Sequence, residues 1–110
     1  MVPVSLDDPA AAEALAWAEE VRATRRVIVE LVSGGAPLAS LPGLAADLGT
    51  PRARGGEVLA ATRIGVLAVA RPDAGKVATR RRLAALGLDE LTAFGEIPAA
   101  LLEALDSTTP

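Results

Sequence analysis

The stretch Arg71-Pro72-Asp73-Ala74-Gly75-Lys76 combines a tight turn with the start of a helix, and it is the most specific chemical feature of the sequence. A helix that begins after small residues presents free backbone N–H groups and the positive end of its dipole, which suits a phosphate. Gly75 lets a phosphate backbone come close, Lys76 adds a cation, and Arg80 lies one turn further along the same side. The turn therefore predicts a phosphate contact. The alternative is a structural turn in which Asp73 caps the helix and fills the anion position itself.

This turn is not a nucleotide-binding P-loop. Ala70 stands where the P-loop requires its first glycine, and Val77 stands where it requires Ser or Thr. The three arginines that follow, Arg80 to Arg82, are separated by about 100° each around a helix, so at most two of them reach phosphates of one strand.

Charge is concentrated in blocks along the sequence. The formal net charge is −3, which as a bulk value argues against a nucleic-acid-binding domain. Residues 52–82 nevertheless carry +6, whereas residues 1–20 and residues 83–110 each carry −5. Because salt confines charge interactions to about 8–10 Å, a local basic surface can bind a polyanion even in an acidic chain. The alternative is a solvated arginine-rich face that pairs with the acidic helices at either end.

The residue types that are missing exclude several function classes. The 110 residues include no cysteine and no histidine, which removes disulfides, cysteine nucleophiles, imidazole bases and the usual N/S zinc sites. We therefore expect no enzymatic activity and no cofactor. The two aromatic residues, Trp17 and Phe94, are too few for a base-stacking reader of single strands. No apolar run approaches the roughly 20 residues of a membrane span and no secretory signal is present, so we expect a cytoplasmic protein without membrane contact.

The length predicts one small domain. Helical periodicity between the turn signals, without clear alternation of apolar and polar residues, predicts that the domain is all-α. Asp8 as N-cap and Pro9 as the first helical residue begin a long helix over residues 9–33, which ends at Gly34-Gly35. Residues at a spacing of three or four give this helix one apolar stripe, formed by Trp17, Val21, Ile28, Leu31 and Val32.

Shorter helices follow, and together with the long helix they form a single domain over residues 9–106. Pro42 interrupts the next helical stretch, so that this stretch is either one short helix or two turns. A basic, flexible hinge follows, and the helix after it has a weak point at Gly65. The predicted segments are a short helix at 37–48, the hinge at 52–56, helices at 57–70 and 76–86, a turn or helix at 89–94, and a last helix at 98–105. We expect residues 1–8 to form a flexible N-terminus and residues 107–110 to be frayed.

Three segments share a pattern with a known family. They run from Arg22-Ala23 through Leu31 and Gly34-Gly35 to Leu38, from Val58-Leu59 through Arg63-Ile64, Leu67, Ala70, Pro72 and Gly75-Lys76-Val77 to Leu86, and from Ala100 to Glu103. On these segments the chain resembles the actinobacterial integration host factor family, small nucleoid-associated proteins with an S13-like helix-two-turn-helix domain. The resemblance covers roughly residues 12–105, and the Pro-x-x-Gly-Lys turn is its most specific part.

The resemblance implies a long N-terminal helix that leads into a compact helix-two-turn-helix region of four to five short helices, at about residues 57–106. Family members bind duplex DNA with little sequence preference, bend or compact it in the nucleoid, and assist site-specific recombination. The phosphate-contacting role of the family's turn falls here on Gly75 and Lys76, and a basic residue of the family matches Arg63. The charge pattern adds Arg80, Arg52 and Arg54. Four or five phosphate contacts imply a slope near −4 for log affinity against log salt.

The chain departs from the family pattern in two regions. An arginine-rich segment that gives the family a second DNA contact is replaced by the acidic stretch Asp89–Gly95, of which only Gly95 fits the pattern. Residues 27–32 have lost the family's bases, and we interpret this apolar stretch as a helix-1 surface that docks a protein partner or a second copy. Two hypotheses follow: a nucleoid-associated protein that binds duplex DNA without base readout, or an interaction module that retains the fold with DNA binding lost or weakened.

Overall fold

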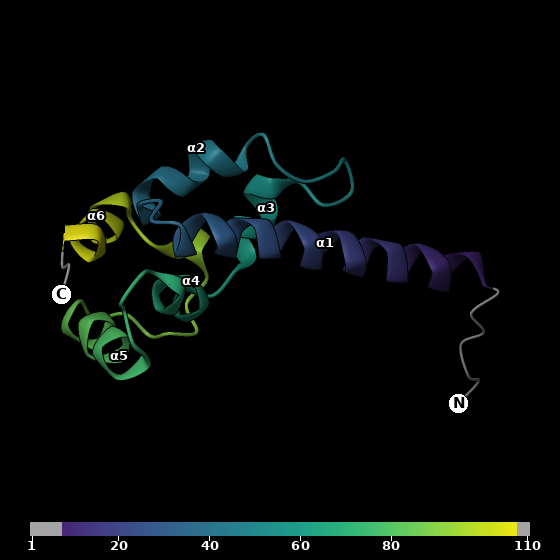
Figure 1. Ribbon diagram of the computed structural model, residues 1–110. Helices are drawn as coiled ribbons and strands as arrows, with labels where there is room; N and C mark the ends of the chain where they lie inside the picture. The colour runs from purple at the N-terminus through teal and green to yellow at the C-terminus, as the bar shows by residue number, and fades with distance from the viewer. Residues whose placement is uncertain (1–7, 108–110) are drawn as a thin grey trace, which may run out of the picture.

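A computed structural model describes residues 8–107, and all regular elements in this range are helical (Figure 1). This confirms the all-α class, with one long helix followed by shorter ones. The elements are α1 (Pro9–Ser33), the 3-10 turn η1 (Leu38–Ser40), α2 (Leu41–Ala45), α3 (Gly55–Ala61), α4 (Ile64–Ala70), α5 (Lys76–Ala85), the 3-10 turn η2 (Phe94–Glu96) and α6 (Ala99–Ser107). The predictions for residues 1–7 and 108–110 lie outside the described residues, but Asp8 is an ordered N-cap and Ser107 is the last residue of α6 rather than a frayed end.

Helix α1 has the bounds that its local signals predict. The Asp8 side chain accepts a hydrogen bond from the backbone N–H of Ala10 at 3.0 Å, and Pro9 occupies the first helical position. At the other end the N–H of Gly34 donates to the carbonyl of Glu30 at 2.9 Å. Only the C-terminal half of α1 packs against α3 and α4, and the N-terminal half extends beyond the rest of the molecule (Figure 1).

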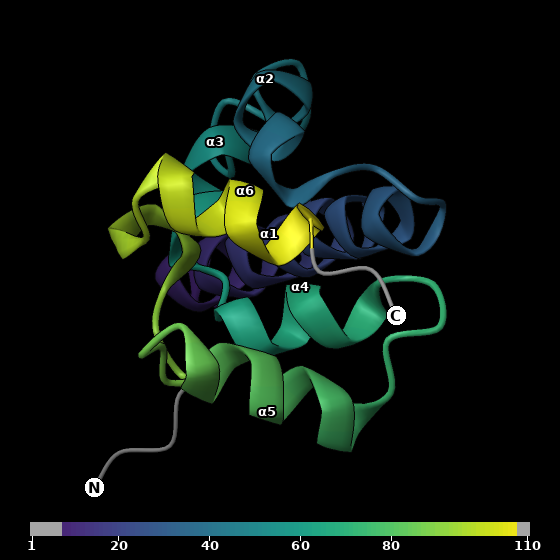
Figure 2. The same ribbon diagram turned by 90° about the vertical axis from the view of Figure 1, so that its left-hand side faces the viewer.

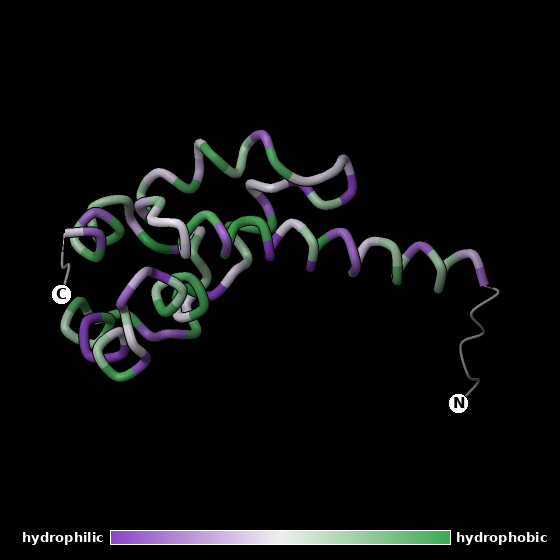
Figure 3. Tube along the Cα trace, viewed as in Figure 1, coloured by the Kyte–Doolittle hydropathy of each residue, from purple (hydrophilic) through white to green (hydrophobic). Residues whose placement is uncertain are grey.

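Two features of α1 differ from the expectations. The predicted apolar stripe is not buried along its whole length: Trp17 is 53% exposed because no other element reaches that far along the helix. Residues 27–32 were interpreted as a docking surface, but Ile28 and Val32 are completely buried. This stretch is apolar because it packs against the chain's own core, and in Figure 3 it is the most hydrophobic part of α1.

The segment after α1 is shorter and less regular than the predicted helix at 37–48. It forms η1 and α2, and Pro42 lies in the first turn of α2, where its missing N–H is harmless. Asp106 of α6 accepts hydrogen bonds from the backbone N–H groups of Leu38 and Ala39, at 2.7 and 3.0 Å. These bonds fasten the last helix to the N-terminus of η1.

The expected single helix at 57–70 is divided into α3 and α4 at Thr62 and Arg63. Both residues are extended, and Thr62 accepts a hydrogen bond from the N–H of Phe94 at 2.8 Å, while the N–H of Ile64 donates to Thr92 at 2.8 Å. Pairing with the segment around residues 92–94 therefore replaces helical hydrogen bonds at this point. Gly65 is no weak point: a Cβ there would lie 2.9 Å from Glu90, so glycine permits this close approach.

The core lies where α1, α3, α4 and α6 meet, with α5 packed along the outer side of α4 (Figure 2). Leu83 is the main contribution of α5, and Phe94, the buried aromatic residue, anchors the return segment before α6. Within residues 8–107 no helix combines the length and the apolar character needed to cross a membrane.

Candidate nucleic-acid interface

The turn between α4 and α5 depends on two left-handed residues. Asp73 has φ 59°, and Gly75 has φ 66° with ψ 144°. L residues almost never adopt the backbone conformation of Gly75, so this position requires glycine. The buried Thr79 donates its hydroxyl hydrogen to the carbonyl of Gly75 at 2.6 Å and thereby fixes the turn to the first helical turn of α5.

The N-terminus of α5 has no cap from the chain itself. No side chain accepts a hydrogen bond from its first turn, and the exposed Asp73 side chain makes no hydrogen bond within the described residues. The alternative in which Asp73 fills the anion position is therefore wrong. Apart from its two chain neighbours, no described residue comes within 4 Å of where a Cβ on Gly75 would lie, so the approach to this helix end is open.

Three of the predicted cations line one cleft along α4 and α5, with Lys76 next to the turn and Arg63 at the opposite end of α4. Arg63, at the start of α4, and Lys76 and Arg80, on α5, line a cleft of about 260 Å³, which we call the cationic cleft. Its lining also includes the Thr79 and Glu90 side chains. Apolar residues supply the rest of its wall: Gly65, Val66, Val69, Leu83 and Leu91. The cleft thus combines positive side chains from two elements with an uncapped helix N-terminus.

Glu90 places a carboxylate among the cations of the cationic cleft. The Nε of Arg80 donates to Oε2 of Glu90 at 3.1 Å, and the two side chains are 69% and 45% exposed. An exposed ion pair of this kind contributes little to stability, so Arg80 is available to another anion at a small cost. This pair could not be predicted from the sequence, because it forms only after the chain reverses at Gly87, which has φ 73°.

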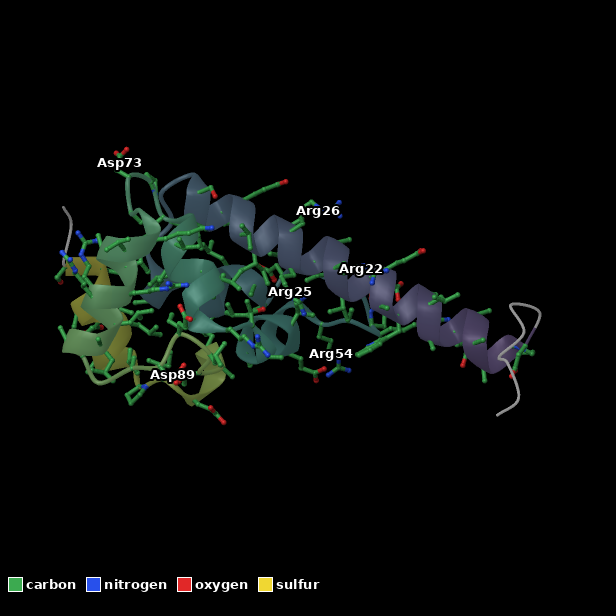
Figure 4. All side chains as sticks on the ribbon, turned by 90° about the horizontal axis from the view of Figure 1, so that it is seen from below. Arg22, Arg25, Arg26, Arg54, Asp73 and Asp89 are labelled. Carbon is green, nitrogen blue, oxygen red and sulfur yellow. The ribbon has the colours of Figure 1, made fainter. Side chains whose placement is uncertain are left out.

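Arg25 is a further cation near the cleft, outside the site residues predicted from the sequence. It lies beside the α3–α4 junction, whereas Arg26 lies on the other side of α1 (Figure 4). With Arg63 and Val66 of the cationic cleft it lines a neighbouring hollow of about 350 Å³, and its Nε is buried without a hydrogen-bond partner. A buried donor that lacks an acceptor marks the place where the hollow would gain from an anion. Three-residue periodicity from Arg22 could have indicated this face.

Arg52 and Arg54 lie apart from the other predicted site residues. They belong to the loop between α2 and α3, and α3 and α4 separate Arg54 from α5 (Figure 4). This loop is not the open hinge that its composition suggested. Gly49 and Arg54 form an isolated bridge, the N–H of Thr50 donates to the carbonyl of Ala53 at 3.0 Å, and Ala53 is buried. The +6 block is therefore two basic regions rather than one.

The other charged residues near the cleft, in the turn, on α5 and in the return segment, make structural contacts or lie on other faces. Nη1 of Arg71 donates to the carbonyl of Leu105 at 2.8 Å, which holds the turn against α6. Arg81 is exposed and Arg82 is half-buried on other faces of α5. Asp89, at the start of the acidic stretch, accepts a hydrogen bond from the N–H of Leu91 at 2.8 Å and so stabilises a turn (Figure 4).

Comparison with protein-family models, with curated proteins and with solved structures finds no match to this chain.

Proposed function

We propose that the protein binds duplex DNA through its phosphate backbone, as a divergent nucleoid-associated protein similar to the integration host factor family. The observation that carries this proposal is one cleft along α4 and α5 that Arg63, Lys76 and Arg80 line, with Lys76 at the uncapped N-terminus of α5. Gly75, which carries no side chain, leaves the approach to that helix end open.

The cleft suits phosphates better than base edges. A phosphate at the first turn of α5 accepts hydrogen bonds from backbone N–H groups, while Lys76 serves as a point charge next to it. Arg63 and Arg80 on either side of the cleft reach neighbouring phosphates, and their guanidinium groups hold them in a fixed orientation. Contacts of this kind position a protein on the duplex without reading sequence.

The acidic stretch at residues 89–96 supports a weaker interaction than that of a strongly basic protein. Glu90 pairs with Arg80, and Asp89 and Glu96 add negative charge on the same return segment. A duplex must displace the Glu90 carboxylate before Arg80 contacts a phosphate. The bulk charge of −3 adds a general repulsion that salt screens.

A titration of fluorescently labelled duplex at two or more salt concentrations tests the proposal. Three cations in the cleft predict a slope of about −3 for log affinity against log salt. This slope is less steep than the −4 expected when Arg52 and Arg54 are included. Duplexes of unrelated sequence are expected to bind with similar affinity. Undetectable binding at low salt, or an affinity that salt leaves unchanged, would contradict the proposal.

A further inference from the structure

The N-terminal part of α1 forms an arm that extends past the other helices; only its last residue, Glu20, lines a hollow with the loop after α2. We define the arm as residues 9–20, which extend about 18 Å at the rise of a regular helix (Figure 1). None of its residues is buried, although it carries Trp17 and Leu15, which are 53% and 48% exposed. Large apolar side chains on a segment that contacts no core mark an interaction surface.

Charge and aromatic character occur on one face of the arm. Glu13 and Trp17 are four residues apart and therefore lie next to each other on the helix surface. With its cap Asp8, the arm carries four acids and no base, giving −4. Its natural partner is a basic cleft with an apolar wall.

The cationic cleft has these properties. Arg63, Lys76 and Arg80 supply the positive charge, and its apolar wall is open to solvent, with Val66 and Leu91 43% and 59% exposed. The arm cannot reach the cleft of its own chain, because α1 is one continuous helix and the arm projects away from α4 and α5 (Figure 1). A second copy of the chain has no such restriction.

We propose that the arm of one copy docks in the cationic cleft of a second copy, with Trp17 against the apolar wall and Glu13 beside the cleft's cations. The contact is heterologous, since it joins different surfaces of the two copies, so that each copy can both donate an arm and accept one. The docking does not depend on DNA binding. If the proposed function holds, arm and duplex compete for the same three cations.

The charge pattern disfavours direct pairing of two arms. Each arm with its cap carries acids and no base, so two arms side by side bring carboxylates together without a cation between them. Arm-to-arm pairing is therefore the outcome that the experiment must separate from arm-to-cleft docking.

Sedimentation velocity from micromolar to millimolar concentration at low salt measures the association, and Trp17 is the only tryptophan, so its emission reports the arm directly. The mass is expected to rise above 11.1 kDa with concentration and to fall with added salt, while Trp17 emission moves to shorter wavelength as copies associate. DNA is absent from this experiment, which keeps its outcome separate from that of the proposed function.

Two variants decide which surfaces meet. The Trp17→Ala variant has an intact cleft but a disabled arm, and the Arg63→Glu variant has an intact arm but a disabled cleft. Each variant alone is therefore expected to stay at the monomer mass. Their equimolar mixture is expected to form a complex of twice that mass. Arg26→Glu, an equal charge change on another face of α1, is the control and is expected to associate like the unchanged chain. Circular dichroism confirms that each variant is folded. A chain that stays at 11.1 kDa throughout, or an Arg63→Glu variant that still associates by itself, overturns the proposal.

Discussion

The cationic cleft and the loop that carries Arg52 and Arg54 hold the same kind of charge in different surroundings. In the cleft, cations from two elements line one hollow, and its Lys76 end adjoins an uncapped helix N-terminus and an open glycine. In the loop, two exposed arginines lie on a short turn whose backbone groups bond to each other. The difference teaches that local backbone geometry, rather than the number of arginines, distinguishes a phosphate site from a solvated basic surface. Substitutions that affect one region and spare the other test this conclusion.

The largest effect is expected from reversing two charges of the cleft. In the double variant Arg63→Glu with Lys76→Glu, two charge-assisted contacts are lost, at about 1.5–3 kcal/mol each. Duplex affinity is expected to fall at least about 100-fold in a binding titration at low salt. Both side chains are exposed, so thermal unfolding should change little. An unchanged affinity in a folded variant would contradict the assignment of the cleft as the DNA-binding surface.

The next effect concerns the backbone of the same region. Gly75→Ala places a side chain at φ 66°, which is expected to lower the free energy of unfolding by about 1–3 kcal/mol and to weaken DNA binding by distorting the turn. Urea unfolding measures the stability. Gly56→Ala is the matched control: Gly56 lies in α3 with open space around it, so alanine there should stabilise by about 0.4–1 kcal/mol. Equal stability of the two variants would contradict the assigned turn geometry.

A smaller effect, of opposite sign, is expected at Glu90. Glu90→Gln removes the carboxylate that holds Arg80, and an exposed ion pair contributes up to about 1 kcal/mol, so duplex affinity should rise up to about fivefold at low salt. Glu103→Gln, an equal charge change on the exposed face of α6, is the control for the general gain in positive charge. If both variants gain equally, Glu90 has no specific influence on the cleft.

The smallest effect is expected in the loop. The double variant Arg52→Glu with Arg54→Glu makes the same charge change as the cleft variant, but it removes no contact of the cleft. Its duplex affinity should fall by about twofold in the same titration, through the long-range charge that salt screens. A loss as large as that of the cleft variant would show that the two basic regions act as one surface.

The parts of this fold that depend on neighbouring residues could be predicted from the sequence. Asp8, Pro9 and Gly34 set the bounds of α1, and Gly75 marks the start of α5. The division between α3 and α4 could not be predicted, because it depends on hydrogen bonds to residues 92 and 94, about thirty positions away.

In the candidate site too, features set by neighbouring residues could be predicted and features set by helix packing could not. Gly75, Lys76 and Arg80 are close along the chain, and their proximity follows from helix geometry. The pair between Arg80 and Glu90, the distance of Arg54 from the cleft and the nearness of Arg25 to Arg63 all depend on how the helices pack. The periodicity of α1 likewise indicates the face of Trp17, but not whether another element covers it.

The most direct test of the central claim locates the duplex on the protein residue by residue. In two-dimensional ¹H–¹⁵N spectra recorded during a duplex titration, the account predicts that the amide resonances of Gly75 to Ala78 and of Arg63 move most, in proportion to the bound fraction. The amides of Ala53 and Arg54 should stay almost unchanged. Spectra that do not respond to the duplex at low salt, or that change mainly at the loop, would contradict the account.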